Sequence, residues 1–416
     1  MGFPGDAPYL LDWANLLLRW LHVITAIAWI VTSYHFVLTD DRLYRPTDPD
    51  LRDKGVDGES WAVHGGGFYH FEKYRIAPKA LPDRLHWSYW EAYSTWASGF
   101  ALLTVLYFFN ASSFLVDPRV HDWSPGAAIA GALAYLVVGW VVYDGLCRIV
   151  GRDRRGDVGG DRLVGLLLFA YVAAAAWVAC HLFAGRAAFL LTGAMLATIM
   201  SANVAMVIIP GQRKVVAALR EGRTPDPNLG KRGKQRSVHN TYVTLPVVVA
   251  MISNHYGPLV QGRWNWLALI GLMTAGAVVR LFFVLRHTGR SRWELVALAS
   301  TLLAATAWIA APAAVGPDAP AAARPPGPEA GRAAVADPSF AAVEAIVATR
   351  CAMCHNAGFA NKGVRLDTPS AIVAHARDIA GQAVIARTMP LNNATGITDD
   401  ERATLGRWVA AGAKGP

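Results

Sequence analysis

Long apolar runs separated by short polar segments make up most of the chain. Eight runs come close to about 20 residues, the length at which an α-helix crosses a lipid bilayer. The second and sixth runs are more polar than the others. The pattern predicts a polytopic membrane bundle of about eight transmembrane helices, at residues 12–38, 90–110, 126–149, 162–184, 187–209, 240–260, 264–286 and 293–314.

The apolar pattern stops after residue 314. Residues 315–335 are rich in Pro and Ala without periodicity, which is typical of an extended linker. Beyond them we expect a helix near 338–350, and a last helix that has Thr398 as its N-cap and acidic residues in its first turn. We therefore predict an all-α protein with a membrane domain at 1–314, a linker at 315–335 and a small all-α domain at 336–416.

Charge supports this division and predicts an orientation. The chain has 416 residues, of which 54% are hydrophobic and only 17% are charged, against about 25% charged in soluble proteins. Basic residues concentrate in loops 39–89, 150–161, 210–239 and 287–292, whereas the alternate loops carry one arginine each: Arg119, Arg186 and Arg263. The positive-inside rule places the basic loops in the cytoplasm of a bacterial inner membrane, and the N-terminus and residues 336–416 on the periplasmic side. The basic cytoplasmic loops then account for the net charge of +9, so membrane lipid is an expected partner and no nucleic-acid partner is needed.

Residues Cys351 to His355 form a C-x-x-C-H motif, the attachment signature of a c-type haem. Cys351 and Cys354 are spaced to form thioethers to one porphyrin, and His355 can then ligate the iron. Met389 is the only methionine after the motif, so we expect it to be the second axial ligand, with His375 as its competitor. The alternatives to a haem attachment motif are a redox pair of thiols or half of a zinc site. Because c-type haem is attached outside the bacterial cytoplasm, the motif agrees with the predicted orientation.

Polar residues inside membrane spans are costly and are therefore candidates for function. His22 lies in the first span, where it could ligate a haem b or make a helix-packing hydrogen bond. His64 precedes three glycines, Glu91 lies at the aromatic start of the second span, and Asn254 and His255 end the sixth. These four could surround a planar, hydrogen-bonding substrate. They could also belong to a flexible turn, an interfacial aromatic belt and helix–helix contacts.

The same segments carry a family resemblance. His64-Gly65-Gly66-Gly67-Phe68-Tyr69, Leu85-His86-Trp87, Trp90-Glu91-Ala92-Tyr93 and the segment Met251–Tyr256 occur on eight spans joined to a cytochrome c. This set resembles the membrane-bound bacterial urate oxidase (urate hydroxylase) family over essentially the whole chain. One position departs from it, since Val31 follows Trp29-Ile30 where the family often has a small residue.

The resemblance implies oxidation of urate to 5-hydroxyisourate in purine catabolism. Electrons would pass through the fused c-type haem to a downstream cytochrome c or terminal oxidase, and no hydrogen peroxide would form. Urate is an anion at neutral pH, so an arginine or a helix N-terminus should bind it. The reaction also needs a general base, and His64, Glu91, Asn254 and His255 are the candidate catalytic residues.

Two points stay open at the level of the sequence. A urate site at the cytoplasmic face would require a carrier across the hydrocarbon core of about 30 Å, which favours a haem b at His22. The alternative function is a quinol-oxidising, membrane-anchored cytochrome c electron carrier, and a transporter is a third reading.

Overall fold

The computed structural model describes residues 7–74, 77–79, 81–152, 158–253, 256–311, 337–357, 359–360, 364–385, 387–393 and 395–416. The predicted linker 315–335 lies outside the described residues, as do Asn254 and His255.

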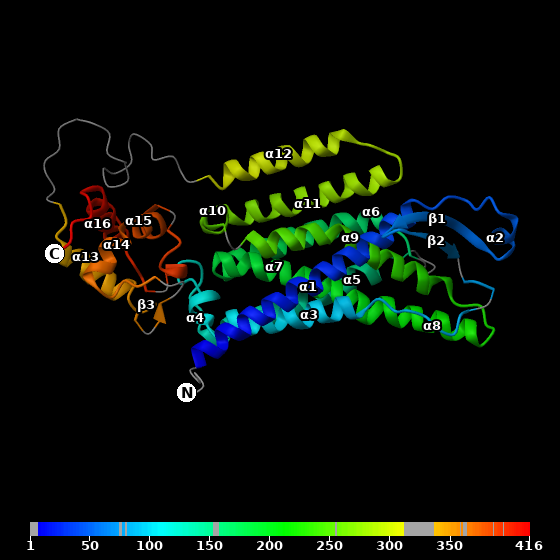
Figure 1. Cartoon of the computed structure of the whole chain (residues 1–416), viewed down its shortest axis with the longest axis horizontal. Helices are drawn as coiled ribbons and strands as arrows, with labels where there is room; N and C mark the ends of the chain where they lie inside the picture. The colour runs from blue at the N-terminus through cyan, green and yellow to red at the C-terminus, as the bar shows by residue number, and fades with distance from the viewer. Residues whose placement is uncertain are drawn as a thin grey trace.

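A helix lies in each of the eight apolar runs, and these helices form an elongated bundle (Figure 1). In this bundle α9 packs between α7 and α11, and α1 packs on α3. The helices are α1 (Ala7–Asp41), α3 (Trp90–Leu103), α5 (Pro125–Ile149), α6 (Asp161–Leu182), α7 (Gly185–Ala202), α9 (Pro227–Ile252), α11 (Asn265–His287) and α12 (Trp293–Ile309).

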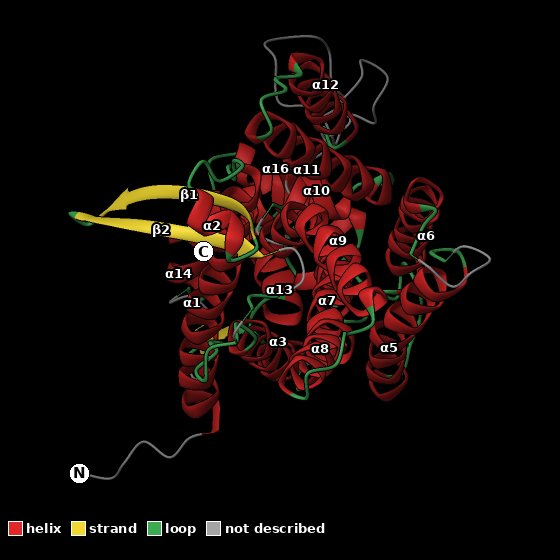
Figure 2. Ribbon diagram, turned by 90° about the vertical axis from the view of Figure 1, so that its right-hand side faces the viewer, coloured by secondary structure: helices red, strands yellow, loops and turns green. Residues whose placement is uncertain are grey.

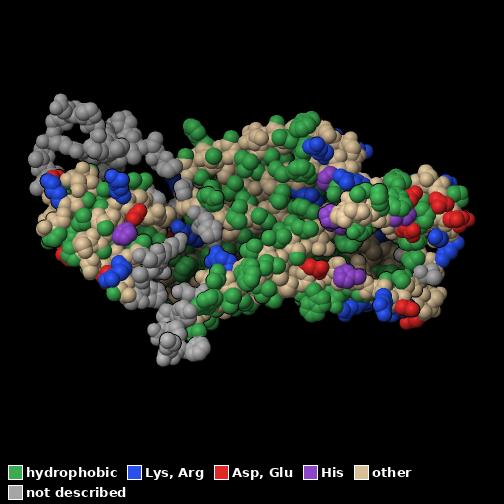
Figure 3. All heavy atoms as spheres, in the orientation of Figure 1, with side chains coloured by type: hydrophobic (Ala, Val, Ile, Leu, Met, Phe, Trp, Pro, Cys, Tyr) green, Lys and Arg blue, Asp and Glu red, His purple; other side chains and the backbone are tan. Residues whose placement is uncertain are grey.

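Five helical stretches within the described residues are long and apolar enough to cross a membrane, and α12 is a shorter apolar helix. The five are Trp13–Asp41, Pro125–Ile149, Asp161–Leu182, Gly185–Arg220 and Asn265–His287. Hydrophobic side chains cover the middle of the face seen in Figure 3, and charged side chains gather mainly toward its ends. This distribution is consistent with a membrane protein.

The predicted basic loop 210–239 is mostly helical. Helix α7 continues through the π-helical segment η2 (Asn203–Ile208) into α8 (Ile209–Arg220). Helix α9 begins at Pro227, and the side chain of Asp226 caps its N-terminus. Charged residues such as Lys and Arg are good helix formers, so both helices extend well past the apolar residues that hydropathy detects.

The fold is mostly helical, as predicted, and a β-hairpin adds two strands that the sequence analysis did not predict. Strands β1 (Val56–His64) and β2 (Gly67–Tyr74) pair antiparallel, with His64 opposite Gly67. The two residues between them, Gly65 and Gly66, have φ of +58° and +82°, as the tight turns of two-residue hairpins require. The hairpin lies beside the short helix α2 (Pro49–Asp53) at one end of the bundle (Figure 1).

The C-terminal domain packs its helices around a separate apolar core that includes Val343, Val347, Leu405 and Trp408. Its elements are α13 (Phe340–Arg350), β3 (His355–Asn356), β4 (Phe359–Ala360), α14 (Pro369–Ala374), α15 (Ala376–Ile379), η6 (Ala380–Ile385), η7 (Leu391–Asn393) and α16 (Asp399–Ala410). The predicted N-cap is confirmed, because Thr398 forms a capping box with Glu401 at the start of α16.

This domain lies at the end of the bundle that carries α4 (Ala111–Phe114), α10 (Gly257–Gln261) and the N-terminus (Figure 1). The hairpin and α8 lie at the opposite end (Figure 1), and the view along the bundle shows the hairpin projecting to one side of it (Figure 2). The start of α1 and the C-terminal domain therefore lie at one end of the bundle, and the side of the membrane on which they lie stays a prediction.

Candidate functional site

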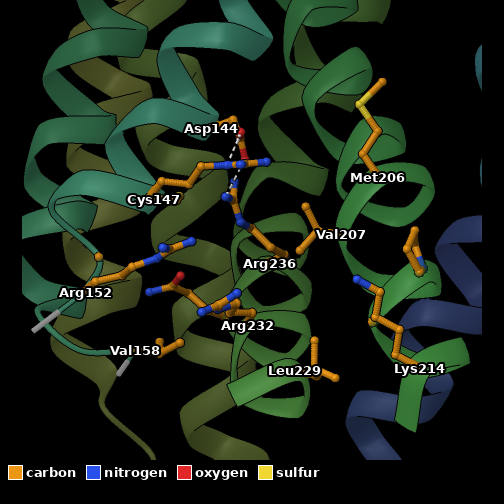
Figure 4. A pocket seen from close by; sticks show the side chains of 15 residues that line it. Asp144, Cys147, Arg152, Val158, Met206, Val207, Lys214, Leu229, Arg232 and Arg236 are labelled. Atoms are coloured by element: carbon orange, nitrogen blue, oxygen red, sulfur yellow. Dashed lines mark hydrogen bonds and ion pairs between the residues drawn. The ribbon is translucent and has the colours of Figure 1, made fainter. Parts of the chain in front are cut away.

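A cavity of about 240 Å³ lies between the ends of α5, α8 and α9, at the hairpin end of the bundle (Figure 4). Five cationic side chains and one carboxylate line it, together with smaller and apolar residues. We call this cavity the basic pocket, and its charged lining consists of Asp144, Arg148, Arg152, Lys214, Arg232 and Arg236.

The helices fix the central charges of the basic pocket. Arg148 lies one turn after Asp144 on α5, and its Nε is 2.5 Å from the Asp144 carboxylate. Arg236 of α9 donates from Nη2 to the same carboxylate at 2.7 Å. Arg236 is only 4% exposed, and its guanidinium lies 4.9 Å from the ring centroid of Tyr143. Asp144 thus orients two of the five cations, and a surplus of positive charge remains.

Arg152 and Arg232 extend into the basic pocket from opposite sides (Figure 4). The Nε of Arg232 is buried and has no hydrogen-bond partner among the described residues. Burial, and then the nearby charges of Arg232 and Arg148, lower the pKa of Arg152. A bound anion would offset the repulsion between these guanidinium groups. Because the volume is below the roughly 300–1,000 Å³ of drug-sized ligand sites, the basic pocket suits a small anion.

A buried hydrogen-bond network leads from the basic pocket into the bundle. Arg236 donates to Asn203 Oδ1 at 3.4 Å, and Asn203 Nδ2 donates to Tyr143 Oη and to Asn240 Oδ1, both at 2.9 Å. Tyr143 Oη in turn lies 2.9 Å from His239 Nδ1. Asn203 is fully buried and begins the π-helical segment η2, the kind of irregularity that often marks functional sites.

Neither of the two predicted urate residues that the structure describes lines the basic pocket. His64 is exposed and ends β1 beside the hairpin turn, and Glu91 lies in the first turn of α3; neither lines this pocket. Asn254 and His255 lie outside the described residues. Their catalytic roles stay predictions. The signal that points to the basic pocket in the sequence is a pair of charged residues, Asp144 and Arg148, inside an apolar span.

His22 lies where α1 meets α3. Its Nδ1 is 3.0 Å from the carbonyl oxygen of Thr95 and 3.2 Å from Ser98 Oγ. Its ring packs so closely on Gly99 that a Cβ there would lie 2.7 Å from His22 Cε1. These contacts are those of a helix-packing histidine. Haem b at His22 stays a prediction that a dithionite-reduced spectrum tests, and we assign no electron step to it.

The residues of the C-x-x-C-H motif fit a covalent haem c. The motif forms a turn after α13, in which the backbone N–H groups of Cys354 and His355 both donate to the Cys351 carbonyl at 3.1 Å. Both thiols are free. His355 Nδ1 lies 3.1 Å from the carbonyl oxygen of Val364. Such a hydrogen bond fixes the ring and directs Nε2 toward a metal.

Met389 lies on a loop whose backbone is fixed on both sides. Its N–H donates to the Gln382 carbonyl at 3.1 Å, and its own carbonyl accepts from Arg402 Nη1 at 2.9 Å. The competing ligand His375 instead has its Nδ1 2.9 Å from the carboxylate of Asp378 at the surface. Iron ligation by Met389, with His375 as its competitor, stays a prediction.

Comparison with known proteins gives one match. A family model described as "Urate oxidase N-terminal" matches residues 8–311, which include all the helices of the bundle and the basic pocket. The match ends before the C-x-x-C-H motif. No curated protein and no solved structure matches the chain.

Proposed function

Since the chain belongs to the urate oxidase N-terminal family, we propose that it is a membrane-bound enzyme that oxidises urate to 5-hydroxyisourate. The family match over residues 8–311 is the observation that carries this proposal. The basic pocket supports it, because urate is a small, planar anion at neutral pH and the pocket offers positive charge in a small volume.

The basic pocket is proposed to bind and activate urate. Arg232 lines the basic pocket, and its guanidinium would bind a urate oxygen or deprotonated nitrogen. Arg236, fixed by Asp144, would add a second cation. Surrounding cations lower the pKa of a bound acid. They therefore favour loss of a further proton from urate, which makes the ring easier to oxidise. Water then supplies the new hydroxyl, and two electrons and two protons leave.

Electrons would leave the protein at its opposite end. The charge pattern places the basic pocket at the cytoplasmic face and the C-terminal domain in the periplasm of a bacterial inner membrane. A c-type haem supplies one-electron redox chemistry when bound. Cys351 and Cys354 would hold it, and His355 and Met389 would ligate its iron. A downstream cytochrome c or terminal oxidase would take the electrons. Oxygen is then not the direct acceptor, and no hydrogen peroxide forms.

Isotope labelling tests this reaction. The purified protein is given urate and an artificial electron acceptor in isotopically labelled water, and the first product is analysed by mass spectrometry. We expect one labelled oxygen in 5-hydroxyisourate, with turnover continuing when oxygen is removed. A product labelled instead from molecular oxygen, or peroxide formed in step with urate loss, would contradict the proposal.

A further inference from the structure

A second cavity, of about 370 Å³, lies between α6, α9 and α11. Its walls are almost entirely apolar. We call it the apolar cavity. Phe169 belongs to its lining and is 51% exposed, so the cavity opens on the side of the bundle, where lipid would surround it. Its lining includes Gly165 and Leu168 of α6, Val243 and Pro246 of α9, and Met273 and Val278 of α11.

One wall of the apolar cavity carries hydrogen-bonding groups. Tyr143 and His239 both line it, and they are joined through Tyr143 Oη and His239 Nδ1 at 2.9 Å. Asn203 donates to the same hydroxyl, so the Tyr143 proton is best directed at His239 Nδ1, and the proton of the neutral imidazole then sits on Nε2. Among the described residues, His239 Nε2 has no hydrogen-bond partner. It can therefore donate to a ligand carbonyl.

The apolar cavity and the basic pocket share a wall. Cys147 lines the basic pocket and His239 lines the apolar cavity, and Cys147 Sγ lies 3.9 Å from His239 Nδ1. The network from Arg236 through Asn203 to Tyr143 crosses the same wall. Two ligands, one in each cavity, would be separated by little more than one layer of side chains. A hydrogen-bonded path would connect them.

We propose that the apolar cavity binds an isoprenoid quinone, which accepts the electrons of the substrate bound in the basic pocket. This inference rests on the proposed function. A quinone combines an apolar tail with two carbonyl groups, which matches apolar walls with donors on one side. A volume of about 370 Å³ falls within the range of roughly 300–1,000 Å³ for ligand sites and fits the ring with the start of its tail.

The step balances in atoms and electrons. A C–O bond forms between the oxygen of water and C5 of urate, and two electrons and two protons are released. The quinone takes up the two electrons, and its two carbonyl oxygens take up the two protons. Urate, water and quinone thus give 5-hydroxyisourate and quinol. A single c-type haem accepts one electron at a time. A quinone can accept two electrons at one end of the bundle, and the quinol can release them one at a time at the other end. Quinol can also move across the hydrocarbon core between the two ends.

A cavity-filling variant tests the site. A Cβ added at Gly165 would meet no heavy atom within 4 Å, so Gly165→Phe can fill the apolar cavity without moving the backbone. Leu166→Phe is the matched control. Leu166 follows Gly165 on α6, and its side chain is 64% exposed on the outside of the bundle. Binding of a short-tailed ubiquinone to the purified, delipidated protein is measured for each. We expect about tenfold weaker binding or more for Gly165→Phe, a cost of about 1.4 kcal/mol or more, and no change for the control.

The outcomes separate this inference from the proposed function. Equal quinone binding by Gly165→Phe and wild type would overturn the site, as would a cavity that takes only lipid acyl chains and no quinone. Urate affinity should be the same in all three proteins. Quinone binding that depends on Gly165 in a protein that oxidises no urate, with any acceptor, would support the quinone site and contradict the proposed function.

Discussion

Arg232→Met tests whether the basic pocket binds the substrate anion. Methionine keeps much of the side-chain length and a good helix propensity. The buried Nε of Arg232 has no partner in the described part of the chain, so its removal breaks no hydrogen bond at that atom. The change also takes away one of the charges that lower the pKa of Arg152. We therefore expect the folded protein to be as stable as wild type, or more stable.

The expected loss in affinity follows from this geometry. A hydrogen bond to a charged group is worth about 1.5–3 kcal/mol, and every 1.4 kcal/mol changes a dissociation constant about tenfold. Removing Arg232 should therefore weaken urate binding about 10- to 150-fold. The dissociation constant is measured by calorimetry on the purified protein in lipid nanodiscs, and thermal unfolding is recorded on the same samples.

Arg290→Met is the matched control. Arg290 is exposed in the loop after α11, at the same end of the bundle, and it does not line the basic pocket. Its removal makes the same change in net charge. Exposed substitutions usually shift free energies by less than about 0.5 kcal/mol, so we expect about a twofold change or less. If both variants weaken urate binding equally, or if Arg232→Met binds urate like wild type, the basic pocket is not the urate site.

Three further predictions concern the core and the C-terminal domain. Arg236→Met should cost about 3 kcal/mol of stability, since it removes one partner of a buried ion pair, and adding Asp144→Leu should restore most of it in the same unfolding assay. Partial burial tends to raise the pKa of Glu401, but hydrogen bonds from the backbone of the N-cap residue and from Arg350 outweigh burial and hold this pKa below its usual range. Its stabilisation is therefore present above the unfolded pKa of about 4.3 and lost as pH falls through the lower folded value. Glu401→Gln should unfold at a lower temperature than wild type at neutral pH but not in strong acid; an equal difference at both would contradict this. Met389→Leu should keep the covalent haem but lose the spectrum of a six-coordinate iron, and an unchanged spectrum would assign the ligand elsewhere.

The sequence predicts the helices of the bundle because a bilayer demands long apolar segments. Its failures have specific causes. Helix α9 starts at Pro227 and α8 ends at Arg220, in segments whose charged residues suggested a loop although they favour helix. The hairpin was missed because the glycines after His64 were interpreted as a flexible turn, although two glycines between two strands are a hairpin signal.

The functional residues, like the fold, could be predicted only in part from the sequence. The C-x-x-C-H motif and the Thr398 capping box involve residues close in sequence, so local spacing is enough to predict them. The basic pocket combines α5, α8 and α9 over residues 144–236. Arg152 and Arg232 lie in the basic loops 150–161 and 210–239, which predicted only the orientation of the chain in the membrane. Their convergence in one pocket depends on how distant helices pack. No local pattern records that packing.

Anaerobic reduction of the C-terminal haem by urate tests the central claim most directly. Urate is added without oxygen to the oxidised, quinone-supplemented protein, and the c-type α-band is followed. We predict that urate reduces the haem and that Arg232→Met slows this reduction at low urate concentration. If urate leaves the haem oxidised while quinol reduces it promptly, the chain is a quinol-oxidising electron carrier and does not oxidise urate.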